Sequence, residues 1–578
     1  MFTTITLTFS SLLVSDITIQ QAAPDTTIAF VSATNIGDVL SKLETAGSCD
    51  KICAAVSSGF NIDYASNAGS AFEGLCDAMG ISSEDFTPPS GYAGAALYPV
   101  VDFESGTVGL GGIAMIQLDE KVYGEFFSEM METSHSAPSV DSEIVSLVGR
   151  DVMMLQYEIP ELDMPLMNLD LEAFEKSYVV YTDGYLIVGS EPDGIASALL
   201  ALDGEVEPDM LETNEDYITL YDRCGGEGDV FGGVLLTNLA DTAMQIDDSN
   251  MAMMIMPSVK TLFGDIDGIA QTATLSPSED VLLEATYTVL MNDGRSGLMS
   301  IIGENTTQSP KPVFVGDDTL MYAQGVLDLN KLVPVLRDTI MGQPMLSMQI
   351  GPQMEMFEAG LTSFLAPLGS KFHTVSTGTM PLNMETVGTL FAIECNDEEA
   401  FGGTLSMTLP AMGATPTDFL GNQIYTIDLG AVIPVSMPME MEYSIAVGGG
   451  YVFIGTQRNV ENALRATANP KDTLTTETTD LSVMLGSDDV SSLGYGDIGK
   501  SIAVQMAMQT ATTDNMLKEM ESFDPQMAEE MRNSFAESSD IYATISELFV
   551  AILGPASWDL KTDEHGMTSR IIVMQSAK

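Results

Sequence analysis

The sequence is short of basic residues. Only 21 Lys and Arg stand against 83 Asp and Glu, which gives a formal net charge of −62 at pH 7. Nucleic acids and anionic lipid headgroups are held by clusters of Lys and Arg, so the composition excludes nucleic acid as a partner. Carboxylates in such excess favour solubility and weak, diffuse binding of cations. Added salt screens their mutual repulsion, which indicates a saline environment.

Histidine is almost as scarce, with three residues at His135, His373 and His565. His135 lies in a polar loop sequence, His373 beside a predicted strand and His565 in a turn. We expect all three at the surface rather than acting as bases. The sequence has no GxSxG motif, no SxxK motif with matching partners and no Cys/His pair in a plausible context. It therefore predicts no catalytic residue and favours a non-enzymatic protein. A hydrolase using paired carboxylates is the enzymatic alternative.

The five cysteines exclude a dense disulfide framework. They are Cys49, Cys53, Cys76, Cys224 and Cys395. If the segment around the first two is helical, they lie on one face, and Cys76 could pair with either. No CxxC spacing and no fourth ligand accompany them, so zinc is not expected. Cys224 and Cys395 are isolated small residues.

Long apolar runs are missing too, since no segment reaches the ~20 apolar residues of a membrane-spanning helix. The first 14 residues form an apolar stretch diluted by Thr and Ser, followed by IQQAAP. Residues 1–23 are predicted as a possible signal peptide ending near Ala22 or Ala23, although a basic n-region is absent. An ordinary first strand is the alternative. Together with the acidic composition, this segment favours export to the periplasm, cell envelope or exterior.

Two stretches of the chain read alike. Gly184–Leu200, GYLIVGSEPDGIASALL, matches Gly450–Leu464, GYVFIGTQRNVENAL, with an offset of 266 residues. Four further pairs follow in the same order: DTTIAF with DDTLMY, IAMIQLDEKVYGEFF with FAIECNDEEAFGGTL, LVGRDVMML with FLGNQIYTI, and TLFGDIDGIAQTATL with ELFVAILGPASWDLK. Their offsets are 292, 278, 272 and 286. Co-linear matches of this kind predict a tandem duplication.

The predicted fold class is α+β, with each half a largely antiparallel sheet carrying helices. Strands are expected at Ala95–Phe103, Val108–Gln117, Val152–Tyr157, Ser177–Tyr181 and Val281–Met291, and helices at Glu120–Met131 and Gly194–Leu202. The turns in YVVYTDGYLIVG and YSIAVGGGYVFIG predict hairpins. Residues 24–302 form the first repeat, 303–315 a polar linker, and 316–578 the second repeat. That repeat carries an inserted long helical segment at about 511–540.

Three motifs recur together on this framework. They are the stretch from Asp318 to Tyr322 before a helix, Asp183 to Ser190 before a helix, and LGPASW from Leu553 before a last strand. The combination resembles a family of large exported bacterial proteins, a domain of unknown function with two internal α+β repeats. The resemblance runs from about Asp25 to the end of the chain. It implies an extracytoplasmic setting and no catalytic or binding residues.

The strand–glycine–helix order at Gly189–Asp193 is one in which proteins cradle phosphates. Here Ser190 and Asp193 fit a capping box, and Glu191 adds another acid to the first turn. These carboxylates would repel a phosphate. The second copy has Thr456 and Asn459 in the corresponding places. The sequence therefore predicts a structural corner and no cofactor.

Acidic clusters raise the possibility of calcium. They lie near Asp141 and at Ile246–Asn250, Phe263–Gly268 and Gly486–Ser492, but none has the EF-hand spacing. Because 83 acids produce short clusters by chance, no specific metal site is predicted.

The 39 methionines gather at Met251–Pro257, Pro344–Phe357 and Pro438–Tyr443. Such clusters are able to hold Cu(I), but methionine also packs irregular cores. We expect a core-facing stripe of Met354, Phe357, Leu361 and Phe364 on one helix. An adaptable Met-rich groove for a lipid or apolar peptide is the alternative. The leading functional prediction is an exported, acidic binding or structural component of the cell envelope. A carrier of an apolar ligand, or a protein partner, comes next.

Overall fold

The computed structural model describes most of the chain. The described residues are 17–45, 91–101, 108–119, 141–156, 176–246, 251–307, 312–342, 347–378, 387–428, 442–469, 489–502 and 553–575, apart from a few positions within these ranges, together with five isolated positions. Cys49, Cys53, Cys76, His135 and most of the helical segments predicted at Glu120–Met131 and 511–540 lie outside them. None of the helices in the described part is long and apolar enough to span a membrane.

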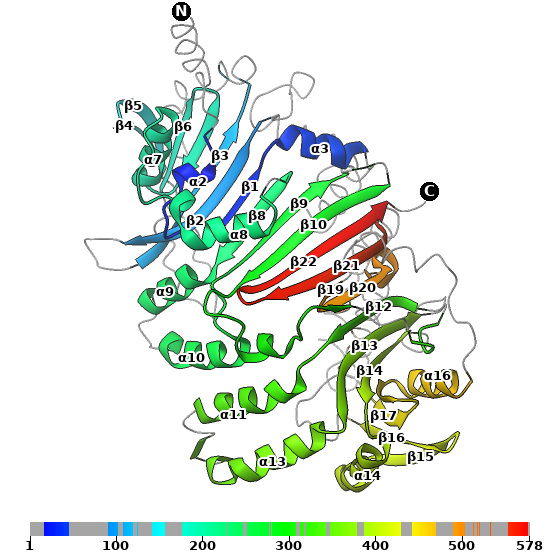
Figure 1. Ribbon diagram of the computed structural model, residues 1–578. Helices are drawn as coiled ribbons and strands as arrows, with labels where there is room; N and C mark the ends of the chain where they lie inside the picture. The colour runs from blue at the N-terminus through cyan, green and yellow to red at the C-terminus, as the bar shows by residue number, and fades with distance from the viewer. Residues whose placement is uncertain are drawn as a thin grey trace, which may run out of the picture.

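In the described part of the chain, a twenty-stranded antiparallel sheet dominates (Figure 1). Ten of its strands come from the first half of the chain, residues 17–305. They are β1 (Ala29–Ala33), β2 (Ala93–Val101), β3 (Val108–Gln117), β4 (Asp141–Leu147), β5 (Arg150–Gln156), β6 (Lys176–Thr182), β7 (Tyr185–Gly189), β8 (Val230–Leu235), β9 (Gly268–Leu275) and β10 (Val281–Leu290). Their order across the sheet is β4–β5–β6–β7–β3–β2–β1–β8–β9–β10.

The other ten strands come from the second half, residues 312–575. They are β12 (Thr319–Val326), β13 (Leu368–Gly378), β14 (Val387–Cys395), β15 (Thr415–Phe419), β16 (Asn422–Asp428), β17 (Glu442–Gly448), β18 (Tyr451–Gly455), β20 (Ser492–Asp497), β21 (Leu553–Asp563) and β22 (Gly566–Gln575). Their order is β15–β16–β17–β18–β14–β13–β12–β20–β21–β22. Strand for strand, the two halves have the same topology.

The halves join where their corresponding last strands, β10 and β22, pair antiparallel. In Figure 1 the red strands β21 and β22 lie between the green strand β10 and the other strands of the second half. Ala285 faces Ile571 and Thr286 faces Arg570 at the middle of this pairing. Because each strand meets its own counterpart, the junction has the geometry of a two-fold dimer interface inside one chain.

Helices pack on the sheet and at its margins. They are α2 (Ile19–Ala22), α3 (Ile36–Thr45), α7 (Pro192–Leu202), α8 (Glu215–Arg223), α9 (Leu236–Ile246), α10 (Met251–Phe263), α11 (Leu332–Gly342), α13 (Met354–Leu365), α14 (Glu398–Thr408) and α16 (Gln457–Ala468). Short 3₁₀ turns include η4 (Gly297–Ile301), η5 (Leu329–Lys331) and η7 (Pro410–Met412), and β11 (Thr306–Thr307) pairs with β19 (Asp489–Val490). Side-chain caps start several of the described helices, with Asn35 accepting from Asp38 N, Asn214 from Tyr217 N and Asp397 from Ala400 N.

In the first half, one face of the sheet is buried under helices. On β1, Phe30 is buried while its neighbour Val31 is 48% exposed, as expected from the alternation of side chains along a strand. There α7 and α8 cover the core. In the second half α16 covers one face and α14 packs on the other, against Tyr425 and Val452. Burial of aromatic and aliphatic side chains between helices and sheet therefore supplies the main stabilisation.

The α+β class and the antiparallel sheet predicted from the sequence are confirmed. Predicted strands recur within one to two residues, Val108–Gln117 without change, and the helix predicted at Gly194–Leu202 begins two residues earlier. Asp183 and Gly184, and likewise Gly449 and Gly450, adopt the positive φ values that two-residue hairpin turns require.

The match of IAMIQLDEKVYGEFF with FAIECNDEEAFGGTL is out of register by one residue in the structure. With the offset of 278, Ile113 would correspond to Phe391. The backbone shows instead that Ser190 N donates to Gly112 O while Thr456 N donates to Thr389 O. These bonds make Leu390 the counterpart of Ile113, with both side chains buried. Since side chains alternate between the two faces, a slip of one residue would have exposed the buried set.

The residues before β1 belong to the folded core. Ile17, Ile19, Ala22 and Ala23, which the sequence placed in a possible signal peptide, are each at most 1% exposed. The backbone N–H of Ile19 donates to the hydroxyl of Tyr92 at 2.7 Å. In the second half, Phe314 and Val315 fill the matching position before β12, so part of the predicted linker at 303–315 is also core.

We expect Ile19→Ala to lower the free energy of unfolding by about 2–5 kcal/mol, because a fully buried isoleucine leaves a cavity. Urea unfolding measures this loss. Thr26→Ala, at an exposed position close by, is the control and should change stability by less than ~0.5 kcal/mol. A chain starting at Pro24 should likewise unfold at lower urea than a chain starting at Ile17. Equal midpoints for the two truncations would contradict the packing of this segment.

Candidate binding site at the junction of the two halves

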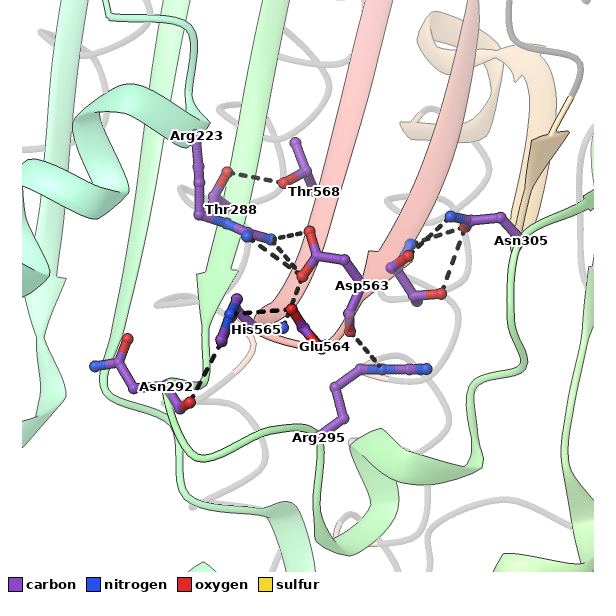
Figure 2. A network of polar contacts seen from close by, with 10 residues as sticks. Arg223, Thr288, Asn292, Arg295, Asn305, Asp563, Glu564, His565 and Thr568 are labelled. Atoms are coloured by element: carbon purple, nitrogen blue, oxygen red, sulfur yellow. Dashed lines mark hydrogen bonds and ion pairs between the residues drawn. The ribbon is translucent and has the colours of Figure 1, made fainter.

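The turn between β21 and β22 carries a network of polar contacts (Figure 2). Its carboxylate, Asp563, receives Nη2 of Arg223 at 3.0 Å and the backbone N–H of His565 at 2.8 Å. Arg223 is the last residue of α8, and its side chain is 17% exposed. This ion pair links a helix of the first half to a hairpin of the second.

The loop after β10 supplies the other side of the network. Arg295 donates from Nε to the carbonyl of Asp563 at 3.1 Å and from Nη1 to the carbonyl of Ile302 at 2.6 Å. Both acceptors are neutral carbonyls, and no acidic side chain within the described ranges forms an ion pair with this guanidinium. Arg295 is therefore held in place with its charge uncompensated by a direct partner.

Asn305 fixes the far end of the same loop. Its Oδ1 accepts from Thr562 N at 2.9 Å and its Nδ2 donates to Thr562 O at 2.8 Å, so the side chain pairs with β21 as a strand backbone would. The Thr562 hydroxyl donates to the carbonyl of Gly303 at 3.1 Å. Every one of these contacts crosses between the end of the first half and the last hairpin.

A cavity of about 460 Å³ opens at this junction. It is lined by two cations, three acids and two neutral polar residues: Arg295, Lys331, Glu304, Asp563, Glu564, Asn305 and Thr562. Lys331 is half-exposed, and its Nζ lies 3.7 Å from Asp328. The carboxylate of Asp563 is paired with Arg223. Glu564 is 87% exposed, with its Oε1 3.5 Å from Nε2 of His565, and Glu304 is the third acid of the lining.

Among the described residues that line the cavity, the only hydroxyl is that of Thr562, which donates to a backbone carbonyl. Ordinary binding cavities measure roughly 300–1,000 Å³, so the volume fits a small molecule. A lining of both charge signs suits a ligand that carries both an anionic and a cationic group.

We expect Asn305→Ala to lower the free energy of unfolding by about 2 kcal/mol, since it leaves the N–H and C=O of Thr562 without their partners. Asn462→Ala removes one exposed bond to Arg465 and is the matched control, with an expected change below ~0.5 kcal/mol. Chemical denaturation of both variants tests this. A loss no larger than that of the control would show that Asn305 does not hold the loop on β21.

The predicted corner at Gly189–Asp193 is a strand–helix corner, but its predicted capping box is wrong. Ser190 is buried, and its hydroxyl accepts from Gly112 N at 2.9 Å on the neighbouring strand β3. Glu191 takes the N-cap position and Pro192 begins the helix. In the second copy, Asn459 donates to Thr377 at 3.1 Å rather than capping α16. The polar side chains at this corner tie helix to sheet.

The expectation that His373 lies at the surface is wrong, because its side chain is only 2% exposed. It lies in β13, and its Nδ1 is 3.0 Å from the hydroxyl of Tyr322 on β12. Phe314 and Tyr451 pack edge-on against its ring. Burial, with a smaller contribution from Lys371, lowers the pKa of His373 to about 4, so the ring is neutral at pH 7. His565 is exposed in the last hairpin turn, as expected.

Acidification should therefore destabilise the second half. The unfolded histidine takes up a proton near pH 6.5, whereas the folded one does so only near its pKa of about 4. Stability from the neutral ring is complete above pH 6.5 and falls as the pH drops towards 4. Since each pKa unit corresponds to about 1.36 kcal/mol, the loss should reach about 3 kcal/mol.

Urea unfolding between pH 7.5 and 4 tests this. His373→Leu removes the titrating group, and its stability should fall less steeply over that interval than that of the wild type. Replacing the exposed His565 by Leu gives the control, which should retain the wild-type slope. Parallel pH profiles for wild type and His373→Leu would rule out the buried neutral histidine as their cause.

The remaining candidates do not form a site in the described part. Cys224 and Cys395 are buried free thiols whose pKa is raised by that burial. No three His, Cys, Asp or Glu side chains among the described residues converge as metal ligands. In the cluster at Phe263–Gly268, Asp265 pairs with Lys260 at 2.7 Å and Asp267 accepts from Asn292 N at 2.6 Å.

The expected methionine stripe is present only in part. On α13, Met354 is buried and Leu361 and Phe364 are half-buried, but Phe357 is 39% exposed. Most of the Pro438–Tyr443 cluster lies outside the described residues.

Sequence reasoning missed the cavity residues. Two cations, Arg295 and Lys331, line the cavity, and Arg223 pairs with Asp563 of the lining. The three are tens of residues apart in the chain and belong to no motif. The scarcity of Lys and Arg was the signal that could have found them. With only 21 basic residues in an acidic chain, few cations are left unpaired to hold a ligand.

Comparison of the chain with protein-family models, curated proteins and solved structures finds no match. The resemblance noted from the sequence therefore stays a prediction.

Proposed function

We propose that this chain is a non-enzymatic binding protein that takes a small zwitterionic molecule, such as a short peptide, into the cavity at the junction. The observation that carries the proposal is the pair of cations, Arg295 and Lys331, beside Glu304 and Glu564 in one cavity. A carboxylate of the ligand would lie against the two cations. Its ammonium group would lie against the two acids.

The charge of the whole molecule narrows the ligand class. A net charge of −62 repels small anions at long range, while a molecule without net charge enters freely. Only close to Arg295 and Lys331 does an anionic group gain attraction. A ligand with both charges satisfies the two conditions, whereas a lipid or other apolar ligand finds no apolar wall among the residues that line this cavity.

We place the protein outside the cytoplasm, in the cell envelope or its surroundings. The acidic composition supports this setting, since such surfaces stay soluble at high salt. The common strand order of the two halves supports an origin by duplication of one ten-stranded unit. Because Ile17–Ala23 are packed into the core, we propose that any processing of the N-terminus leaves these residues in place.

Binding of trialanine, measured by saturation-transfer NMR and calorimetry, tests the function. Trialanine should bind, and its C-terminal amide and N-acetyl derivatives should bind more weakly because each lacks one charge. Lys331→Gln should weaken binding about three- to tenfold, the range expected when one charged contact is lost.

Lys500→Gln is the matched control. Lys500 is exposed and pairs with Asp497 three residues before it, as Lys331 pairs with Asp328, but it lies away from the cavity. Its affinity for trialanine should equal that of the wild type. The proposal fails if the two variants bind alike, or if the amide binds as tightly as the free peptide.

A further inference from the structure

Four helices form a row along one side of the molecule. In Figure 1, α9, α10, α11 and α13 follow one another down this side, and each contacts the next. The first two belong to the first half and the last two to the second half. The row therefore crosses the junction between the halves, and α11 begins at Leu332, directly after the cavity residue Lys331.

Exposed large apolar side chains gather on this row. They define what we name the Met-rich helical face: Leu239, Met244, Val259, Phe263, Met341, Met356 and Phe357 on the four helices, with Met348 in the segment between α11 and α13. Met348 and Met356 are 75% and 71% exposed. Exposed apolar side chains gathered on neighbouring elements favour an interaction site, and flexible methionine side chains adapt to a partner's shape.

The charged residues on this row and the net charge of the chain indicate which kind of partner the Met-rich helical face attracts. The two cations on the row are already paired, Lys260 with Asp265 at 2.7 Å and Arg337 with Asp338 at 2.7 Å. Asp241 on α9 and Glu355 on α13 add further negative charge. A second copy of this chain, at −62, is repelled, and so is an anionic membrane. A partner that is both apolar and cationic is attracted.

We propose that the Met-rich helical face docks a cationic amphipathic helix of a partner protein. The apolar side of that helix packs on Met348, Met356 and their neighbours, and its Lys and Arg residues lie near the flanking acids. With 13 residues, α10 is about 20 Å long, so a partner helix of about four turns has the length of one helix of the row. The proposal does not depend on the ligand of the cavity.

Fluorescence anisotropy with a labelled 18-residue Leu/Lys amphipathic peptide tests the proposal. The peptide should bind, and added salt should weaken the binding by screening. A scrambled peptide of the same composition has the same charge but no apolar side. It should bind at least tenfold more weakly, as should a Leu/Glu version.

Matched double variants locate the site. Met348→Gln with Met356→Gln should weaken binding of the Leu/Lys peptide about tenfold, because the apolar area buried on docking is reduced. Met407→Gln with Met412→Gln changes two methionines that are 73% and 53% exposed on α14 and η7. These elements are not part of the row, although α14 packs on α13 through Phe401 and Phe364. This control should bind within twofold of the wild type.

Three results would overturn the proposal. Equal binding of the amphipathic and scrambled peptides would mean that only the overall charge attracts them. Equal affinities of the two double variants would place the site elsewhere. A dimer in sedimentation that Met348→Gln with Met356→Gln dissociates would show that a second copy covers this face.

Discussion

The antiparallel pairing of β10 with β22 is the interaction on which the architecture depends. Each of these strands would otherwise end a ten-stranded sheet with a row of unpaired N–H and C=O groups, and such edges recruit other chains. Pairing them satisfies both edges at once. Glu284 and Arg570 reinforce the seam with an ion pair at 2.6 Å, and Thr288 faces Thr568. Two similar halves thereby become one continuous sheet.

The pairing of β10 with β22 also fixes where the chain passes from the first half to the second. At one end of the pairing, the chain leaves β10 and crosses to the second half through residues 291–305, next to the last hairpin. The loop is held there by Arg295 and Asn305, and the hairpin by Arg223. The cavity lies where this connection passes the turn, so its position at the junction follows from the way the halves are joined.

Local patterns in the sequence predicted local structure well. The turn at Asp183–Gly184 and its counterpart at Gly449–Gly450 need positive φ, and Asp-Gly and Gly-Gly are typical of such hairpin turns. Burial was harder to predict. His373 sits in a polar sequence, yet β12 and the segment at Phe314 cover it. Ser190 has the spacing of a cap, yet the neighbouring strand offers it better partners.

The sequence by itself determined the strands, their hairpins and the matching order of elements in the two halves, because these depend on alternation and turn chemistry within a few residues. Tertiary structure alone decided that β10 pairs with β22, that Arg295 meets Lys331 in one cavity, and that Ile17–Ala23 are core. Each of these is a contact between residues distant in the chain. Such contacts are selected by packing and complementarity between whole elements, which no local pattern encodes.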